Sequence, residues 1–317
     1  MKTYVIGHLK PDTDSVVSVL ALAEFYRQNP SFNRQEAEAV ITGPINKETN
    51  FLLKKFDTDI PKILTVDDIQ ASDQIVLVDH NEADQRLEGM RAEQIVEIVD
   101  HHKANLSLSQ PIFMNFKTWG ASATIIYYLM KKHQFAPKKN LAGLMLSAIL
   151  SDTVGFKSST CTKQDIKTAN ELAEIAGISD IEALTLEIFK AKSDLSQMTC
   201  EEMVKNDYKI FEFSGKRVMI DQLETVEQQK LIDENKDCLL KAMDKVKKEL
   251  EIDLIFVVVS DILKVNSKIL LSSDAETEIA ELAFGSQAST QVIDIGAKLS
   301  RKKEIAPAIE KVIQNNI

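Results

Sequence analysis

Cysteine is scarce in this sequence, and its three copies lie far apart. Cys161, Cys200 and Cys238 do not form the CxxC spacing of a zinc or redox site. An odd number of distant cysteines is typical of reduced thiols in a cytoplasmic protein. We expect all three to serve as small buried hydrophobic residues.

Long hydrophobic runs and an excess of positive charge are also missing. The first residues, MKTYVIGHLKPD, hold too short an apolar stretch for a signal peptide, and no later run approaches a membrane span. The 38 lysines and arginines are outnumbered by 48 aspartates and glutamates, which gives a formal net charge of −10. This balance argues against a broad basic face for nucleic acid but is compatible with a local basic pocket.

Strand and helix patterns alternate over residues 1–190. The expected strands are Tyr4–Gly7, Ala37–Thr42, Ile75–Asp79 and Ile95–Asp100, and the expected helices are Ser15–Arg27, Ala121–Gln134, Leu141–Ser151, Lys163–Ala176 and Ile181–Ala191. Nearly continuous apolar strands between helices predict an α/β domain. Its sheet should be buried and mostly parallel, with helices on both faces.

A polar stretch separates this domain from a second one. At 317 residues the chain is long for one domain. We expect a linker at 191–197 and a smaller α/β domain over 198–317. Its expected strands are Lys209–Phe213, Lys216–Ile220, Asp253–Val259 and Lys268–Ser272, and its expected helices are Val226–Leu250 and Glu304–Gln314.

Four of the five histidines follow apolar, strand-like runs and lie beside an aspartate or one short turn from it. They are His8 in YVIGHLKPDTD, His80 in IVLVDHNE, and His101 and His102 in IVEIVDHH. Imidazole and carboxylate are ligands that bind divalent transition metals without sulfur. Because ligands of such sheets gather beyond the carboxyl ends of the strands, the pattern predicts one metal centre there.

Carboxylates near these histidines are the other candidate ligands. Asp12 and Asp14 follow His8 by four and six residues, where a loop can turn both toward it, although capping of the next helix is the alternative. Asp79 follows four apolar residues, so its burial requires a cation or several donors, and an Asx-turn is the alternative. Asp152 follows the apolar run LAGLMLSAIL and is either a metal ligand or part of an ion pair.

Two further patterns bear on the site. In Asp100–His101–His102, adjacent side chains point in different directions, so one histidine can face a metal while the other faces a substrate. His80 is either a supporting residue or a turn residue. Arg301–Lys302–Lys303 places three cations just before the last helix, where they can reach into a cleft or form a generic basic turn.

Together, the strings GHLKPDTDS, LVDHNE, VDHH, SAILSD and SRKK resemble the family II (manganese-dependent) inorganic pyrophosphatases of the DHH phosphoesterase superfamily. In this order and spacing they are highly specific, and the resemblance runs over essentially the whole chain. It implies a DHH metal-binding catalytic domain over 1–190 and a DHHA2-type substrate-clamping domain over 198–317, with the active site in the interdomain cleft.

The resemblance also implies a role for each residue. The metal ligands would be His8, Asp12 and Asp79 at one manganese site, and Asp14, Asp79, His101 and Asp152 at the other, with Asp79 bridging. The substrate-binding residues would be His102, Lys209, Arg301 and Lys302, with His102 also a catalytic proton donor and with Lys205 a competitor for the place of Lys209. Asp100 and His80 would support these residues.

The implied activity is hydrolysis of pyrophosphate to two phosphates, a reaction at a phosphoric anhydride. Two Mn²⁺ ions, or Co²⁺ in their place, would share a bridging hydroxide, and further Mg²⁺ would arrive with the substrate. We expect the domains to close across the linker near Lys192–Ser196. The resemblance further implies a homodimer through the first domain.

Two alternatives remain. Other DHH phosphoesterases act on short oligonucleotides or on polyphosphate, but those acting on nucleotides usually carry a glycine-rich GGGH-type motif. This sequence has 10 glycines and no such string. A nonenzymatic metal-binding protein is the alternative of another class, and it would need no Arg301–Lys302 pair.

Overall fold

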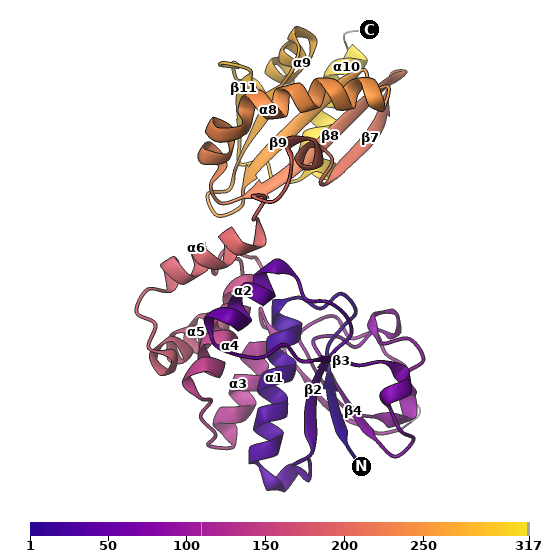
Figure 1. The fold of residues 1–317 in the computed structure, drawn as a ribbon, viewed down its shortest axis with the longest axis vertical. Coiled ribbons are helices and arrows are strands. Elements are labelled where there is room, and N and C mark those ends of the chain that lie inside the picture. Colours follow the sequence, from indigo (N-terminus) through magenta and orange to yellow (C-terminus); the bar gives the residue numbers. More distant parts are fainter. Residues whose placement is uncertain (109, 316–317) are drawn as a thin grey trace. The chain divides into compact units, whose positions relative to one another are not determined.

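The computed structural model describes residues 1–108 and 110–315, and it divides into two compact units, Met1–Lys192 and Ser193–Ile317 (Figure 1). Each unit is an α/β domain with its own sheet. The division falls inside the stretch 191–197 where the sequence predicts a linker. Among the described residues, no helix combines the length and apolar character needed to cross a membrane.

The first unit is built on a six-stranded, fully parallel sheet of order β3-β2-β1-β4-β5-β6. Its strands are β1 (Thr3–Ile6), β2 (Ala37–Ile41), β3 (Lys62–Ile63), β4 (Gln74–Val78), β5 (Ile95–Asp100) and β6 (Phe113–Phe116). Its helices are α1 (Thr13–Gln28), α2 (Lys47–Lys55), α3 (Ser122–Lys132), α4 (Lys139–Asp152), α5 (Lys163–Ala176) and α6 (Ile181–Lys192). Because β1, β4 and β5 are neighbours and parallel, their carboxyl ends lie side by side.

The two faces of this sheet are covered differently. α1 packs against β1 and β2, α3 contacts β5, and α4 packs against α1. On the other face, Ile6 and Leu77 belong to a cluster covered by Leu87, Met90 and Leu106 from loops and turns. Among the described residues, loops and turns cover this cluster, whereas helices were expected on both faces of the sheet. Short apolar loop segments bury this face instead.

The second unit carries a five-stranded mixed sheet of order β11-β10-β9-β8-β7, in which only β8 and β9 pair in parallel. Its strands are β7 (Tyr208–Phe213), β8 (Lys216–Thr225), β9 (Leu254–Asp261), β10 (Asn266–Leu271) and β11 (Val292–Gly296). Its helices are α7 (Cys200–Val204), α8 (Gln228–Glu249), α9 (Asp274–Phe284) and α10 (Ala306–Asn315), and a π-helical turn over Arg301–Ile305 leads into α10.

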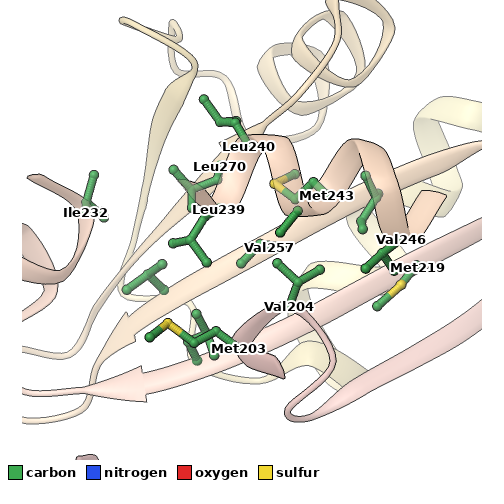
Figure 2. Close-up of a cluster of buried hydrophobic side chains, with 14 of the residues drawn as sticks. Met203, Val204, Met219, Ile232, Leu239, Leu240, Met243, Val246, Val257 and Leu270 are labelled. Atoms are coloured by element: carbon green, nitrogen blue, oxygen red, sulfur yellow. The ribbon is translucent and has the colours of Figure 1, made fainter. Parts of the chain in front are cut away.

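Alternating side chains of β8 and β9 build a core on each face of this sheet. Figure 2 shows one of them, where Leu239 and Met243 of α8 meet Val257 of β9, with Met203 of α7 in the same cluster. On the other face, residues such as Phe256 pack against α10 and α9. The sheet is thus covered by helices on both sides, which fixes the position of the turn before α10.

One expectation is wrong in this unit. Cys200 of α7 and Cys238 of α8 are joined by a disulfide, with a Cα–Cα distance of 6.0 Å, whereas Cys161 in the first unit is free. The three thiols were expected to be reduced and buried. The 38-residue separation in sequence hides the contact, because the sequence alone does not show that α7 docks onto α8.

Candidate metal centre

The candidate site lies where three neighbouring parallel strands end. His8 follows β1, Asp79 follows β4, and His101 follows β5 directly. Helices supply the remaining carboxylates: Asp12 is the N-cap of α1, Asp14 lies in its first turn, and Asp152 is the last residue of α4. The structure thus gathers side chains that are up to 144 positions apart, from 8 to 152, at one edge of the sheet.

One group of donors surrounds His8. Its Nε2 lies 3.5 Å from Asp12 Oδ1 and 3.5 Å from Asp79 Oδ2. Its Nδ1 lies 2.7 Å from the Leu9 carbonyl oxygen and must carry a proton to donate to it. This bond fixes a proton on Nδ1, so that Nε2 is the nitrogen that offers its lone pair to a metal when the imidazole is neutral.

A second group surrounds His101 in the same way. Its Nε2 lies 3.2 Å from Asp79 Oδ1 and 3.6 Å from Asp152 Oδ2, and Asp14 is close enough to contribute a ligand atom. Its Nδ1 is held at 3.0 Å by the Trp119 carbonyl oxygen. The two oxygens of Asp79 therefore face different histidines, one in each group.

Asp79 is also unusual in its backbone. Its φ of +62° lies in the left-handed region, which aspartate tolerates better than most residues. Ser122 Oγ donates a 2.9 Å hydrogen bond to Asp79 Oδ1. This turn carries the buried carboxylate across the end of the sheet, between the two histidines.

The electrostatics of the gathered groups is unbalanced without a cation. Burial and the neighbouring charge of Asp79 raise the pKa of Asp14 to about 8, and burial together with Asp14 raises that of Asp152 well above its ordinary value. Burial opposes protonation of His8, but its hydrogen bonds to Asp12 and Asp79 outweigh that and raise its pKa to about 11. Bound cations would relieve the repulsion among the carboxylates.

The donor set fits divalent metal ions. His101 Nε2 is buried and has no hydrogen-bond partner among the described residues, which is costly unless a metal uses it. Three groups each bring their ligand atoms within 4.8 Å of one another: His8 with Asp12 and Asp79, Asp14 with His101 and Asp152, and Asp79 with His101 and His102, which shares one residue with each of the other two. Imidazole nitrogen and carboxylate oxygen suit Mn²⁺ or Co²⁺.

His102 and His80 differ sharply from each other. The side chain of His102 is 50% exposed, and its Nδ1 lies 2.9 Å from Asp100 Oδ1; this hydrogen bond raises its pKa. His80 is buried, and burial lowers its pKa to about 4, so it is neutral. Its Nδ1–H donates to the Val78 carbonyl oxygen at 2.9 Å. The exposed histidine is therefore the one that can meet a substrate.

A cavity of about 610 Å³ opens over these groups. It is lined by the candidate ligands and by further polar residues: His8, Asp12, Asp79, His101, His102, Asp152, His80, Glu82, Asp84, Gln85, Asn105, Gly120 and Thr160. A polar cavity of this kind suits a small charged ligand rather than an apolar one.

The candidate cations of the second unit lie around one strand pair. Arg301 donates from Nη1 to the Asp207 carbonyl oxygen and from Nη2 to Asp207 Oδ1 at 3.0 Å, and its Nη1 is 3.4 Å from the carbonyl oxygen of Ile220. Ile220 is the register partner of Lys209 across β7 and β8. Lys209 and Lys302 are both exposed.

Lys205, the sequence competitor of Lys209, is engaged elsewhere. Its Nζ pairs with Glu249 at 2.7 Å and with Glu201 at 3.5 Å. These contacts belong to the α7–α8 packing, which favours Lys209 as the cation available to a ligand.

Sequence reasoning missed the residues that hold the ligands in place. Asn81 donates to Asp100 Oδ2 at 2.6 Å, and the backbone amides of Ser122 and Ala123 donate to Asp14 at 2.6 and 3.0 Å. The asparagine is visible in the string DHNE. A backbone donor has no signature beyond the start of the helix at GASAT.

Comparison with known proteins agrees with this arrangement. Residues 2–149 match the model of the DHH family, N-terminal domain, and residues 186–312 match that of the DHHA2 domain. The manganese-dependent inorganic pyrophosphatase of Methanocaldococcus jannaschii is 36% identical over 97% of this chain and 98% of its own. A protein of Archaeoglobus fulgidus with the name "Probable manganese-dependent inorganic pyrophosphatase" is 39% identical over 97% of each chain.

A solved structure is similar as well. The crystal structure of a Methanococcus jannaschii protein provisionally assigned to the family II inorganic pyrophosphatases superposes with a TM-score of 0.60 at 36% identity, covering 98% of this chain and 99% of that one. Sequence similarity of this extent, spanning both domains, shows that the chain belongs to the family II (manganese-dependent) inorganic pyrophosphatases of the DHH superfamily.

Proposed function

We propose that this protein hydrolyses inorganic pyrophosphate to two phosphate ions at a dinuclear manganese centre in its first unit. The observation that supports this most is the position of Asp79, whose two oxygens face His8 and His101 separately. A carboxylate shared by two donor groups suits a pair of divalent ions. The full-length relative from Methanocaldococcus jannaschii is named a manganese-dependent inorganic pyrophosphatase.

The ligand assignment follows the two groups. His8, Asp12 and Asp79 would hold one ion, and Asp14, Asp79, His101 and Asp152 would hold the other. When bound, the pair of Mn²⁺ ions, or Co²⁺ in their place, would act as Lewis acids and lower the pKa of a water molecule. Additional Mg²⁺ would enter with the substrate as its counter-ion.

His102 is the proposed substrate contact and proton donor. Asp100 accepts from both the backbone N–H and Nδ1 of His102, at 3.0 and 2.9 Å, which fixes the ring. Its raised pKa favours the protonated form. His102 would thus offer Nε2–H to a phosphate oxygen and pass a proton to the leaving phosphate.

The second unit would supply the cations that bind the phosphates. Arg301 is held by Asp207 and Ile220, so its guanidinium is already oriented, and Lys302 follows it in the same π-helical turn. Together with Lys209 they would neutralise charge on the oxygens of the substrate. In this proposal residues 1–190 form the catalytic domain and residues 198–317 clamp the substrate.

Phosphate release from three substrates tests the function. After preincubation with Mn²⁺ and with Mg²⁺ in the assay, we expect release from pyrophosphate to be much faster than from a short polyphosphate or a dinucleotide. Preference for the dinucleotide or the polyphosphate would reassign the enzyme to another branch of the superfamily. No release from any substrate would indicate a nonenzymatic metal-binding protein.

Two variants separate the metal centre from the clamp. Asp79→Asn should abolish tight binding of Mn²⁺, because it removes a ligand from both groups. Arg301→Ala should keep Mn²⁺ affinity and raise KM about tenfold or more, since a charge-assisted phosphate contact is lost. Lys303→Ala, at an exposed lysine of the same turn, is the matched control and should alter neither. An Arg301→Ala enzyme with unchanged KM and kcat would remove Arg301 from the clamp.

We also infer that the protein forms a homodimer through the first unit. β6 is an edge strand of the parallel sheet, and its side chains Phe113 and Met114 are 72% and 56% exposed. An exposed apolar edge strand favours association with another copy. Sedimentation equilibrium should give twice the chain mass of 35.5 kDa, and a monomeric mass would refute the dimer.

A further inference from the structure

A short segment of the first unit contacts ligands in both proposed metal sites. The Trp119 carbonyl oxygen accepts from His101 Nδ1 at 3.0 Å. The amides of Ser122 and Ala123 donate to the two oxygens of Asp14, and Ser122 Oγ donates to Asp79 Oδ1 at 2.9 Å. The orientation of three proposed ligands therefore depends on the conformation of residues 119–124, which we call the ligand-holding segment.

Asp165 of α5 binds this segment near both ends. Its Oδ2 accepts from the Gly120 amide at 2.9 Å, and its Oδ1 accepts from Thr124 Oγ1 at 2.7 Å. The side chain is fully buried at 0% exposure. A fully buried carboxylate is stable only when hydrogen-bond donors satisfy it, so these bonds are costly to break.

The fit around Gly120 is close. A Cβ atom on Gly120 would lie 2.7 Å from Thr153 Cγ2 and 3.0 Å from Asp165 Oδ2. Thr153 directly follows the proposed ligand Asp152. Gly120 is thus enclosed between the carboxylate of Asp165 and the end of α4, and a side chain at this position would displace one of them.

Asp165 does more than cap its own helix. It is the third residue of a capping box with Thr162, whose N–H and Oγ1 donate to Oδ2 at 2.8 and 2.6 Å. A capping box uses donors of its own helix start. The bonds to Gly120 and Thr124 reach 45 and 41 positions back in sequence and add nothing to the cap.

We propose that Asp165 is a positioning residue of the metal centre: it fixes the ligand-holding segment, which in turn orients His101, Asp14 and Asp79. This inference rests on the proposed metal centre, but it concerns metal affinity and not the identity of the substrate. Residues that orient ligands typically contribute 10- to 100-fold to metal affinity.

The test is Mn²⁺ binding to the metal-stripped full chain, measured by equilibrium dialysis or titration calorimetry. Asp165→Asn keeps the size of the side chain but replaces one acceptor oxygen by an NH₂ group and removes the charge. An NH₂ group facing the Gly120 amide cannot bond to it, and one facing Thr124 Oγ1 reverses that bond and leaves only neutral hydrogen bonds to the segment. We expect Mn²⁺ to bind about 10- to 100-fold more weakly to the folded variant. Because no substrate is present, a failed pyrophosphatase assay with intact Mn²⁺ binding would refute the proposed function and leave this inference standing.

Glu276→Gln provides the matched control. Glu276 is an equally buried carboxylate near the start of α9, and it accepts from Ser272 N, Ser272 Oγ, Ile255 N and Lys247 Nζ at 2.8–2.9 Å, all in the second unit. Its loss should lower the melting temperature at least as much and leave Mn²⁺ affinity unchanged. If Asp165→Asn lowers only the melting temperature, Asp165 is a helix cap and the proposal fails.

A milder pair of variants covers the case in which Asp165→Asn does not fold. Thr124→Val removes the hydroxyl that donates to Asp165 Oδ1 while keeping the shape of the side chain, and Thr124→Ser keeps the hydroxyl. We expect weaker Mn²⁺ binding for Thr124→Val and near wild-type binding for Thr124→Ser. Equal affinities in the two variants would overturn the proposal.

Discussion

Asp221 is a buried carboxyl group with only part of its hydrogen bonding satisfied. It is fully buried in β8; its Oδ1 accepts from the Asp207 amide at 3.0 Å, whereas its Oδ2 has no partner among the described residues. Burial raises its pKa from 3.8 to about 7, against the opposing effect of the Asp207 amide. The charged form is thus disfavoured in the folded chain.

The sign of the resulting pH dependence follows from this shift. A carboxyl group whose pKa is higher in the folded state stabilises the fold below its unfolded value near 4, and that contribution is lost as the pH rises to about 7. Asp221→Asn, which stays neutral and can still accept from Asp207, should therefore raise the free energy of unfolding at pH 8 by up to roughly 4 kcal/mol, since each pKa unit corresponds to about 1.4 kcal/mol. At pH 4 the difference should be close to zero or reversed.

Urea unfolding of both proteins at pH 4, 6 and 8 measures this difference. Asp253→Asn, at an exposed carboxylate whose Oδ2 accepts from the Arg217 amide, controls for the replacement of an aspartate at the end of the sheet. A pH-independent difference between Asp221→Asn and the parent would show that Asp221 is ionised in the fold.

The candidate metal ligands at the strand ends could be predicted from the sequence, because imidazole and carboxylate side chains follow several apolar runs in the same way. Their convergence follows from the adjacency of β1, β4 and β5, which a parallel sheet makes natural. Asp165 could not be found in this way. Its string TKQD indicates only a capping box, and its distant partners are a backbone amide and a threonine hydroxyl.

At the scale of elements, α7 is tied to α8 by three kinds of contact. The Cys200–Cys238 disulfide joins them covalently. Lys205 pairs with Glu249 at 2.7 Å and Lys245 with Glu201 at 2.6 Å. Met203 and Val204 of this five-residue helix are buried in the core shown in Figure 2. So short a helix is held by these tertiary contacts rather than by its own propensity.

Reduction of the disulfide should weaken the second unit without releasing α7. For a loop of 38 residues, the loss of the cross-link should lower the free energy of unfolding by roughly 3–4 kcal/mol in the chain-entropy description. Thermal unfolding with and without a dithiol reductant measures this, together with the Cys238→Ser variant. Cys161→Ser is the control for the free thiol, and an equal loss there would point to a general effect of thiol chemistry.

Two strands that the sequence did not predict share a physical cause. β3 has only two residues, both exposed, and β6 is an edge strand with the half-exposed sequence FMNF. Neither has the apolar alternation that marks a strand, because pairing with one neighbour is enough to form it. The long apolar strands β4, β5 and β9 are buried on both faces, and they could be placed to within one or two residues.

At the scale of the whole molecule, the candidate site residues of opposite charge belong to different units. The first unit gathers the carboxylates Asp12, Asp14, Asp79 and Asp152 with the candidate histidines, and the second carries the cations Lys209, Arg301 and Lys302. Pyrophosphate is highly charged, and its bound form would need both the metal ions and these side chains. Binding energy from both units is therefore available to bring them together.

We expect a non-hydrolysable pyrophosphate analogue to reduce the radius of gyration of the Mn²⁺-loaded protein in small-angle X-ray scattering. The Arg301→Ala variant should show less compaction at the same analogue concentration. Without this side chain, an analogue bound at the metal ions gains less binding energy from the second unit. Lys303→Ala should compact like the parent chain. If the analogue binds tightly, as calorimetry would show, but leaves the scattering curve unchanged, the substrate is held without domain closure.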